Sequence, residues 1–103
     1  MQRGLCNNPA RLETLDSFQL CNVSLIKIDA ENFELQVLEG ARETILRNHP
    51  IILIEIMGNH RKAREEEIDI DFFTHTIIEY IKLLGYEVRN IYLDDYIALP
   101  LKI

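Results

Sequence analysis

The segment LIKIDAENFELQVLEG, which begins at Leu25, joins a strand-like run, a short acidic junction and a helix-like run without a gap. The run Val23–Ile28 is short and rich in β-branched residues, which is typical of a strand. The apolar residues of Phe33–Asn48 recur at helical spacing. This junction constrains the fold most strongly, because ligands of open α/β sheets gather at the carboxyl ends of parallel strands.

Local signals mark the ends of the first helix and the positions of the later elements. We expect Glu31 or Asn32 to cap the first helix, and Pro50 to prevent its continuation. Five segments then complete the pattern: a strand at Ile51–Ile56 that is apolar enough to be covered on both faces, a polar loop or short surface helix at Gly58–Asp71, a helix at Phe73–Leu84 ended by a left-handed Gly85, and a hairpin of Tyr86–Tyr92 and Tyr96–Leu101.

The resulting order, β-α-β-α-β-β, predicts an α/β fold. Alternating strands and helices imply parallel strands with right-handed crossovers, and the hairpin adds an antiparallel strand. We therefore expect part of a doubly wound, Rossmann-like sheet that ends in an antiparallel hairpin. The 103 residues correspond to one domain, residues 1–103, of which residues 1–20 are an irregular lead-in.

Composition excludes several classes of partner. The formal net charge is −6 and no cluster of Lys and Arg occurs, which argues against a nucleic-acid partner. The longest apolar run, Ile51–Ile54, is far shorter than the roughly 20 residues that cross a bilayer, so we expect no membrane partner. Cys6 and Cys21 are too few and too far apart for a redox or zinc motif, and we interpret them as reduced thiols. The amino terminus has no apolar signal-like stretch, and these features together predict a cytoplasmic protein.

Several blocks of the sequence, taken together, resemble the FkbM-type methyltransferases. They occur in that family's order and spacing and cover most of the chain. The blocks are TLDSF (Thr14–Phe18), LIKIDAENFELQVLEGARETI (Leu25–Ile45), PIILIEI (Pro50–Ile56), LLGYEV (Leu83–Val88) and DDYIALP (Asp94–Pro100).

The resemblance implies the C-terminal half of a class I methyltransferase domain. Such enzymes use S-adenosylmethionine, mostly to methylate hydroxyl oxygens of small or carbohydrate-like acceptors. The glycine-rich cofactor loop of the family has no counterpart, because no two of this chain's four glycines lie close enough to form one. No residue here is therefore assigned to the cofactor, and activity of the isolated chain is left open. Asn32 stands where the family usually has glycine, and asparagine tolerates a left-handed backbone better than most residues.

Asp29 and Glu34 are the candidate catalytic residues. Asp29 ends the first strand, where a carboxylate can accept a proton from an acceptor hydroxyl or simply cap the helix. Glu34 falls within the apolar arc of the first helix, and an inward carboxylate needs a partner. That partner is a substrate, a cation or a basic side chain such as Lys27.

Glu31, Glu55 and His60 are the candidate substrate-binding residues. Glu55 ends the second strand and should emerge at the same edge of the sheet as Asp29. Glu31 is also explained as a helix starter, and His60 as an exposed loop residue. Convergence of Asp29, Glu34 and Glu55 would suit Mg²⁺ or Ca²⁺, but no spacing motif supports a metal and none is assigned. No serine or cysteine lies in a motif that predicts an activated nucleophile.

Two alternatives to an intact enzyme remain open. The chain is either a non-catalytic, truncated pseudoenzyme that acts as an interaction module, or a fragment of a larger gene product. In both cases the first strand, Val23–Ile28, has an exposed edge. We expect that edge to form a homo-oligomer or to pair with a missing N-terminal half.

Overall fold

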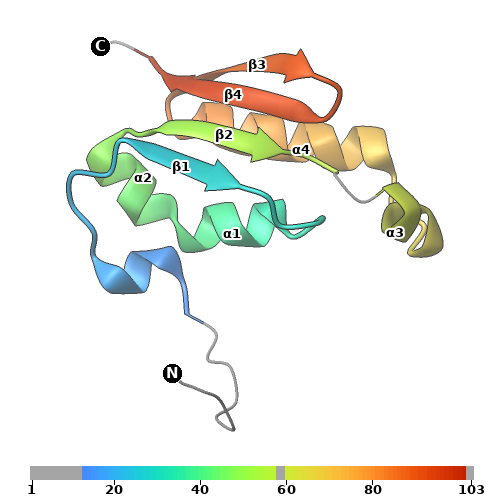
Figure 1. The fold of residues 1–103 in the computed structure, drawn as a ribbon, viewed down its shortest axis with the longest axis horizontal. Helices are drawn as coiled ribbons and strands as arrows, with labels where there is room; N and C mark the ends of the chain where they lie inside the picture. The colour runs from blue at the N-terminus through green and yellow to red at the C-terminus, as the bar shows by residue number, and fades with distance from the viewer. Residues whose placement is uncertain (1–12, 58–59, 102–103) are drawn as a thin grey trace, which may run out of the picture.

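The computed structural model describes residues 13–57 and 60–101, which form a four-stranded sheet and its helices (Figure 1). This confirms the expected mixed α/β fold. In chain order the elements are η1 (Leu15–Phe18), β1 (Leu25–Ile28), α1 (Glu34–Gly40), α2 (Arg42–Asn48), β2 (Ile51–Glu55), α3 (His60–Glu65), α4 (Ile70–Leu83), β3 (Tyr86–Tyr92) and β4 (Asp95–Pro100).

The strands lie in the spatial order β1-β2-β4-β3. β1 is parallel to β2, with Ile28 opposite Ile54. β4 is antiparallel to both of its neighbours, and its first residue, Asp95, lies opposite Glu55 at the end of β2. The carboxyl ends of β1 and β2 and the start of β4 therefore meet at one edge of the sheet.

Helices α1, α2 and α4 lie on one side of the sheet (Figure 1). The side chains of Ile28, Ile52 and Ile54 face them and are at most 3% exposed. On the opposite face, Leu25 is 55% and Ile51 is 39% exposed. The prediction that the second strand is covered on both faces is therefore wrong for the described residues, whose helices cover one face only.

The single helix expected at Phe33–Asn48 is interrupted at Ala41 and forms α1 and α2. Packing of η1 against the break explains the interruption. A Cβ atom at Gly40 would lie 3.1 Å from the Thr14 Cβ, which is an unusually tight contact, so glycine allows this close approach without a shift of Thr14. The expected cap was also wrong, because Phe33 occupies the N-cap position and makes no side-chain capping bond.

The second half of the chain follows its prediction more closely. The polar segment contains the six-residue helix α3, as one of the two expected alternatives. α4 begins three residues earlier than expected, because the Asp69 side chain accepts a hydrogen bond from the Phe72 N–H at 3.0 Å and caps it. Gly85 follows with φ +95°, which confirms the expected left-handed residue after this helix.

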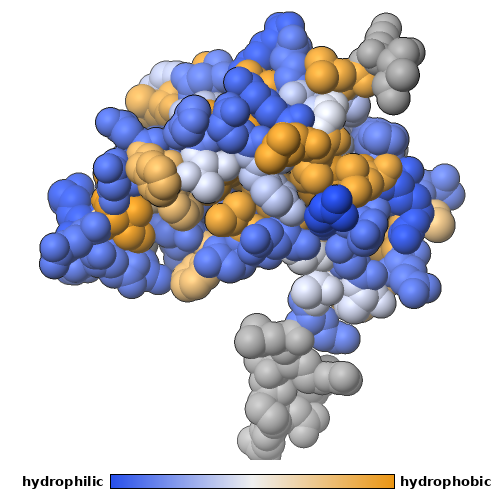
Figure 2. All heavy atoms as spheres, turned by 180° about the vertical axis from the view of Figure 1, so that it is seen from behind, coloured by the Kyte–Doolittle hydropathy of each residue, from blue (hydrophilic) through white to orange (hydrophobic). Residues whose placement is uncertain are grey.

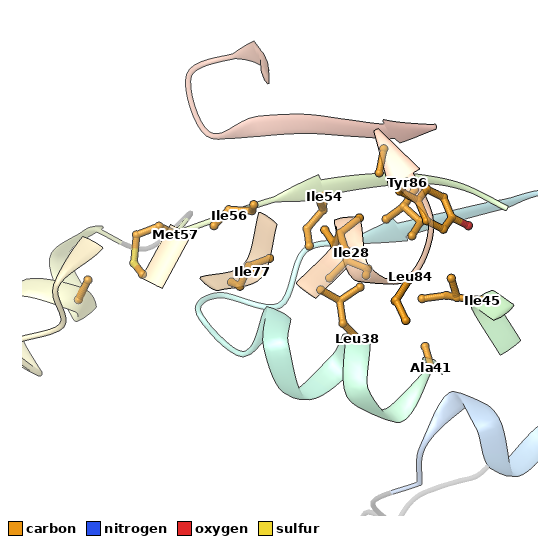
Figure 3. Close-up of a cluster of buried hydrophobic side chains, with 14 residues drawn as sticks. Ile28, Leu38, Ala41, Ile45, Ile54, Ile56, Met57, Ile77, Leu84 and Tyr86 are labelled. Atoms are coloured by element: carbon orange, nitrogen blue, oxygen red, sulfur yellow. The ribbon is translucent and has the colours of Figure 1, made fainter. Parts of the chain in front are cut away.

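The core lies between the sheet and the helices, as Figure 3 shows for Ile28 and Ile54 above Leu38. Tyr86, at the start of β3, is 1% exposed, and its hydroxyl donates a 2.6 Å hydrogen bond to the Pro50 carbonyl. Burial raises the pKa of Tyr86 to about 12. This side chain therefore fixes β3 to the connection between α2 and β2.

The surface seen from behind, where α4 lies, is hydrophilic over most of its area and also shows apolar residues (Figure 2). Two of the exposed apolar side chains belong to α4, Phe72 at 69% and Leu83 at 84% exposure. Within the described residues, none of the helices has both the length and the apolar character needed to span a bilayer. Cys21 is an exposed free thiol, whereas Cys6 lies outside the described residues.

Candidate functional site

A pocket of about 210 Å³ opens at the carboxyl ends of β1 and β2. Asp29, which follows β1, and Glu55, which ends β2, both line it. The expectation that these two carboxyl groups share one edge of the sheet is therefore confirmed. The other lining residues are Lys27, Ile28, Leu53, Ile54, Ile91, Asp95 and Tyr96.

The electrostatics of the pocket centre on Glu55. Its pKa is raised from 4.5 by burial first, then by a hydrogen bond with Asp29 and by the negative charge of Asp29. The charges of Asp95 and Asp94 act in the same direction. Glu55 consequently keeps its proton to a higher pH than an ordinary glutamate does.

Tyr96 of the β3–β4 hairpin also lines the pocket and is a second group with a raised pKa. Burial, and then the charge of Asp94, raise the pKa of Tyr96. Sequence reasoning missed both Asp95 and Tyr96 as pocket residues. The signal that could have found them is the antiparallel pairing of β4 with β2, which starts β4 beside Glu55.

A tight turn connects Asp29 to α1. The Phe33 N–H donates to the Ala30 carbonyl at 3.1 Å, and the two residues between them have positive φ, 46° at Glu31 and 80° at Asn32. Two successive positive φ values are typical of a type I′ turn, which favours glycine or asparagine. Asn32 therefore adopts a left-handed backbone at the position where the resembled family has glycine.

Glu34 is fully buried, as its place in the apolar arc indicated. Its Oε2 accepts a 2.9 Å hydrogen bond from the Asn32 N–H. Its partner is thus a backbone group, and the alternative partner Lys27 lines the pocket instead. Glu34 does not line that pocket, so the structure does not bring it together with Asp29 and Glu55.

The remaining two candidates lie beside the pocket without lining it. Glu31 is exposed in the turn. His60, at the start of α3, contacts the Asp94 carboxylate, with 2.8 Å between Nε2 and Oδ2. Asp94 in turn accepts a hydrogen bond from the Ile56 N–H through its own carbonyl, at 2.9 Å. His60 therefore links α3 to the hairpin at the same edge of the sheet.

The groups described at this edge form neither a cluster of metal ligands nor a glycine-rich cofactor loop. Within residues 13–57 and 60–101, no three His, Cys, Asp or Glu side chains are grouped so that they could hold a metal ion. The two glycines described have other tasks, since Gly40 packs on Thr14 and Gly85 follows α4. The pocket is also smaller than the roughly 300–1,000 Å³ of ordinary small-molecule sites.

Most of the chain matches one known protein family. Residues 9–88 match the family model described as the methyltransferase FkbM domain. The chain belongs to this family. The match includes Asp29 and Glu55, the two acidic residues that line the pocket from β1 and β2. No curated protein and no solved structure matches the chain significantly.

Proposed function

We propose that this domain serves a methyltransferase that methylates a hydroxyl oxygen of a small or carbohydrate-like acceptor, with S-adenosylmethionine as methyl donor. Family membership supports methyl transfer in general. The observation that carries the site assignment is the pairing of Asp29 with Glu55 at the carboxyl edge of two parallel strands. This is the edge at which open α/β sheets bind their ligands.

The two carboxyl groups have different roles in this proposal. Asp29 is the more exposed and would accept the proton of the acceptor hydroxyl as the methyl carbon bonds to the acceptor oxygen and its bond to the sulfur of the donor breaks, which leaves a neutral thioether. Burial and the neighbouring negative charges raise the pKa of Glu55, so Glu55 holds its proton to a higher pH than an ordinary glutamate does. Its proton fixes the orientation of the Asp29 carboxylate. The small pocket receives the reacting end of the acceptor, while Glu31 and His60 contact the parts that remain outside.

The methyl donor requires groups beyond the described residues, and we propose that they join this domain along β1. β1 is the last strand of the sheet on its side. The Ile51 N–H donates to the Ser24 carbonyl, so alternate residues of β1 point their backbone groups at β2. Leu25 and Lys27 point theirs outward, beside an apolar cleft of about 500 Å³. A strand from the cofactor-binding part of the enzyme fits this edge. The same edge would serve a non-catalytic module, but nothing in the structure favours that function over catalysis.

Transfer of a labelled methyl group tests the catalytic proposal. The chain, assembled with the cofactor-binding part that is proposed to pair along β1, is incubated with methyl-labelled S-adenosylmethionine and a panel of sugars and small alcohols, and label in the acceptor is counted. We expect Asp29→Asn to reduce transfer by about 100-fold or more, the usual contribution of a general base. Glu66→Gln, which removes an exposed carboxylate on the other side of α3, is the matched control. Transfer by Asp29→Asn at the wild-type rate, or no labelled hydroxyl in the whole panel, contradicts the proposal.

A further inference from the structure

The buried carboxylate of Glu34 has no place in the pocket, yet it contacts the turn that leads out of it. We infer that Glu34 is a positioning residue, whose hydrogen bond to the Asn32 N–H holds the left-handed turn after β1 and thereby keeps Asp29 beside Glu55. The importance of that placement for methyl transfer rests on the function proposed above. The placement itself does not.

The left-handed turn after β1 needs support from the residues around it. Glu31 and Asn32 both have positive φ, which is unfavourable for glutamate and is tolerated by asparagine less readily than by glycine. A turn of this kind persists only where the surroundings hold it. The Asn32 N–H is directed to the Glu34 carboxylate, and Asn32 is only 8% exposed, so water does not replace this partner easily.

Burying the carboxyl group of Glu34 carries an unfavourable free energy. Glu34 is 0% exposed, and its Oε1 has no hydrogen-bond partner among the described residues. Burying a polar atom without a partner is unfavourable, and a leucine would pack into an apolar arc at no such cost. A glutamate at this position is therefore explained by the hydrogen bond that it accepts from the Asn32 N–H, and this hydrogen bond fixes the turn.

The turn at Glu31 and Asn32 lies next to Asp29 in the chain, and Asp29 lines the pocket. Only Ala30, whose carbonyl accepts the closing hydrogen bond, separates Asp29 from the two left-handed residues. A change of backbone conformation at Glu31 and Asn32 therefore redirects the chain as it leaves β1. Asp29 lies beyond the last paired residue of that strand, Ile28, so the ladder does not hold it in place independently.

The test uses the pKa of Glu55 as a sensor of the distance to Asp29. Carboxyl carbons are followed by NMR across a pH titration in the wild type, Glu34→Leu and Glu34→Gln. We expect the pKa of Glu55 to fall toward 4.5 in Glu34→Leu, because Asp29 moves away. Glu34→Gln retains an oxygen that accepts the Asn32 N–H, so it should keep the raised value.

Two further variants separate positioning from a merely structural role. Thr44→Val changes another fully buried polar side chain, distant from the pocket, and is expected to destabilise the fold without changing the pKa of Glu55. Asn32→Gly combined with Glu34→Leu should recover the raised pKa, since glycine adopts the turn without help. It also keeps the test available if Glu34→Leu alone does not fold.

The outcomes are distinct from those of the transfer assay. An unchanged pKa of Glu55 in folded Glu34→Leu, or a double variant that does not recover the raised pKa, overturns the inference and leaves the catalytic proposal untouched. A Glu34→Gln variant that behaves as Glu34→Leu also overturns it. Failure of Asp29→Asn to affect methyl transfer contradicts only the catalytic proposal.

Discussion

Glu55 shows how the environment of one residue couples its ionisation to folding. Its pKa in the folded protein is raised above 4.5, so the folded state binds this proton more tightly than the unfolded state. The resulting stabilisation is fully present below pH 4.5 and is lost as the pH rises through the raised value. The site at which we propose catalysis through Asp29 thus loses stability as the pH rises, which is typical of functional carboxyl pairs.

The variant Glu55→Gln should remove this pH dependence. Relative to the wild type, its free energy of unfolding is expected to increase as the pH rises above 4.5, because the glutamine has no proton to lose. Urea denaturation at several pH values between 4 and 8 measures the difference. Glu66→Gln controls for the loss of an exposed carboxylate. A constant difference between Glu55→Gln and the wild type would show that the folded state does not raise this pKa.

Tyr86→Phe tests the hydrogen bond that joins β3 to the end of α2. The Pro50 carbonyl loses its 2.6 Å donor in a buried site, so we expect a loss of about 1–3 kcal/mol in stability. Since the pKa of Tyr86 is raised to about 12, the wild type should lose this advantage as the pH rises from about 10 to about 12. Thermal or urea unfolding measures both effects. Tyr92→Phe, at an exposed position, should change stability little.

At the scale of elements, Asp16 of η1 holds the start of α2. Its carboxylate accepts hydrogen bonds from the Glu43 and Thr44 N–H groups, at 3.0 and 2.8 Å, and from the Thr44 hydroxyl at 2.8 Å. Burial acts to raise the pKa of Asp16, but these hydrogen bonds and the charge of Arg47 hold it below 3.8. α2 has no side-chain cap of its own, so Asp16 supplies one from a distant part of the chain.

Asp16→Ala should therefore cost about 1–2 kcal/mol, as the loss of a helix cap does. The stabilisation by Asp16 is present above pH 3.8 and is lost as the pH falls through the lowered pKa, so the variant should be less sensitive to acid than the wild type. Circular dichroism during acid titration measures this. Glu13→Ala removes an exposed carboxylate near η1 and is the control. Equal stability of Asp16→Ala and the wild type at neutral pH, or a difference in stability that does not shrink as the pH falls below 3.8, would contradict the assigned role.

The elements that the sequence predicted well are those with local signals. Apolar runs located β1 and β2, helical spacing located α4, and Gly85 marked its end. The parallel pairing of β1 with β2 also followed from the alternation of strands and helices, and it placed Asp29 beside Glu55.

What the sequence did not predict depends on contacts between distant or backbone groups. The break at Ala41 reflects packing of Gly40 on Thr14, and the cap of α2 comes from a residue 28 positions before Thr44. Glu34 was expected to be buried, but its partner is a backbone N–H, which no pattern of side chains reveals. Asp95 reaches the pocket only because β4 pairs with β2.

At the scale of the whole molecule, and within the residues that the structure describes, the outer edge of β1 has no neighbouring strand and one face of the sheet has no helix over it, so both expose apolar surface. Leu25 belongs to both and is 55% exposed. Backbone groups of Leu25 and Lys27 point away from β2 and offer hydrogen bonds to another strand. We therefore expect the chain to self-associate at high concentration when no partner strand is present.

A proline at Lys27 tests this edge. Its N–H points outward, so Lys27→Pro removes no hydrogen bond to β2 and should change stability by less than about 1 kcal/mol. The association seen by light scattering should weaken markedly. Ile26→Pro is the contrasting variant, because the Ile26 N–H faces β2 and its loss should unfold the domain. A wild type that stays monomeric at high concentration would argue against an exposed pairing edge.

The account depends above all on the placement of Asp29 and Glu55 at one rim of the sheet. The most direct measurement is the pKa of Glu55, obtained by NMR titration of its carboxyl carbon in the wild type and in Asp29→Asn. We predict a value above 4.5 in the wild type that falls when the charge of Asp29 is removed. The same value in both proteins would show that the two carboxyl groups do not meet, and the proposed acceptor site would lose its basis.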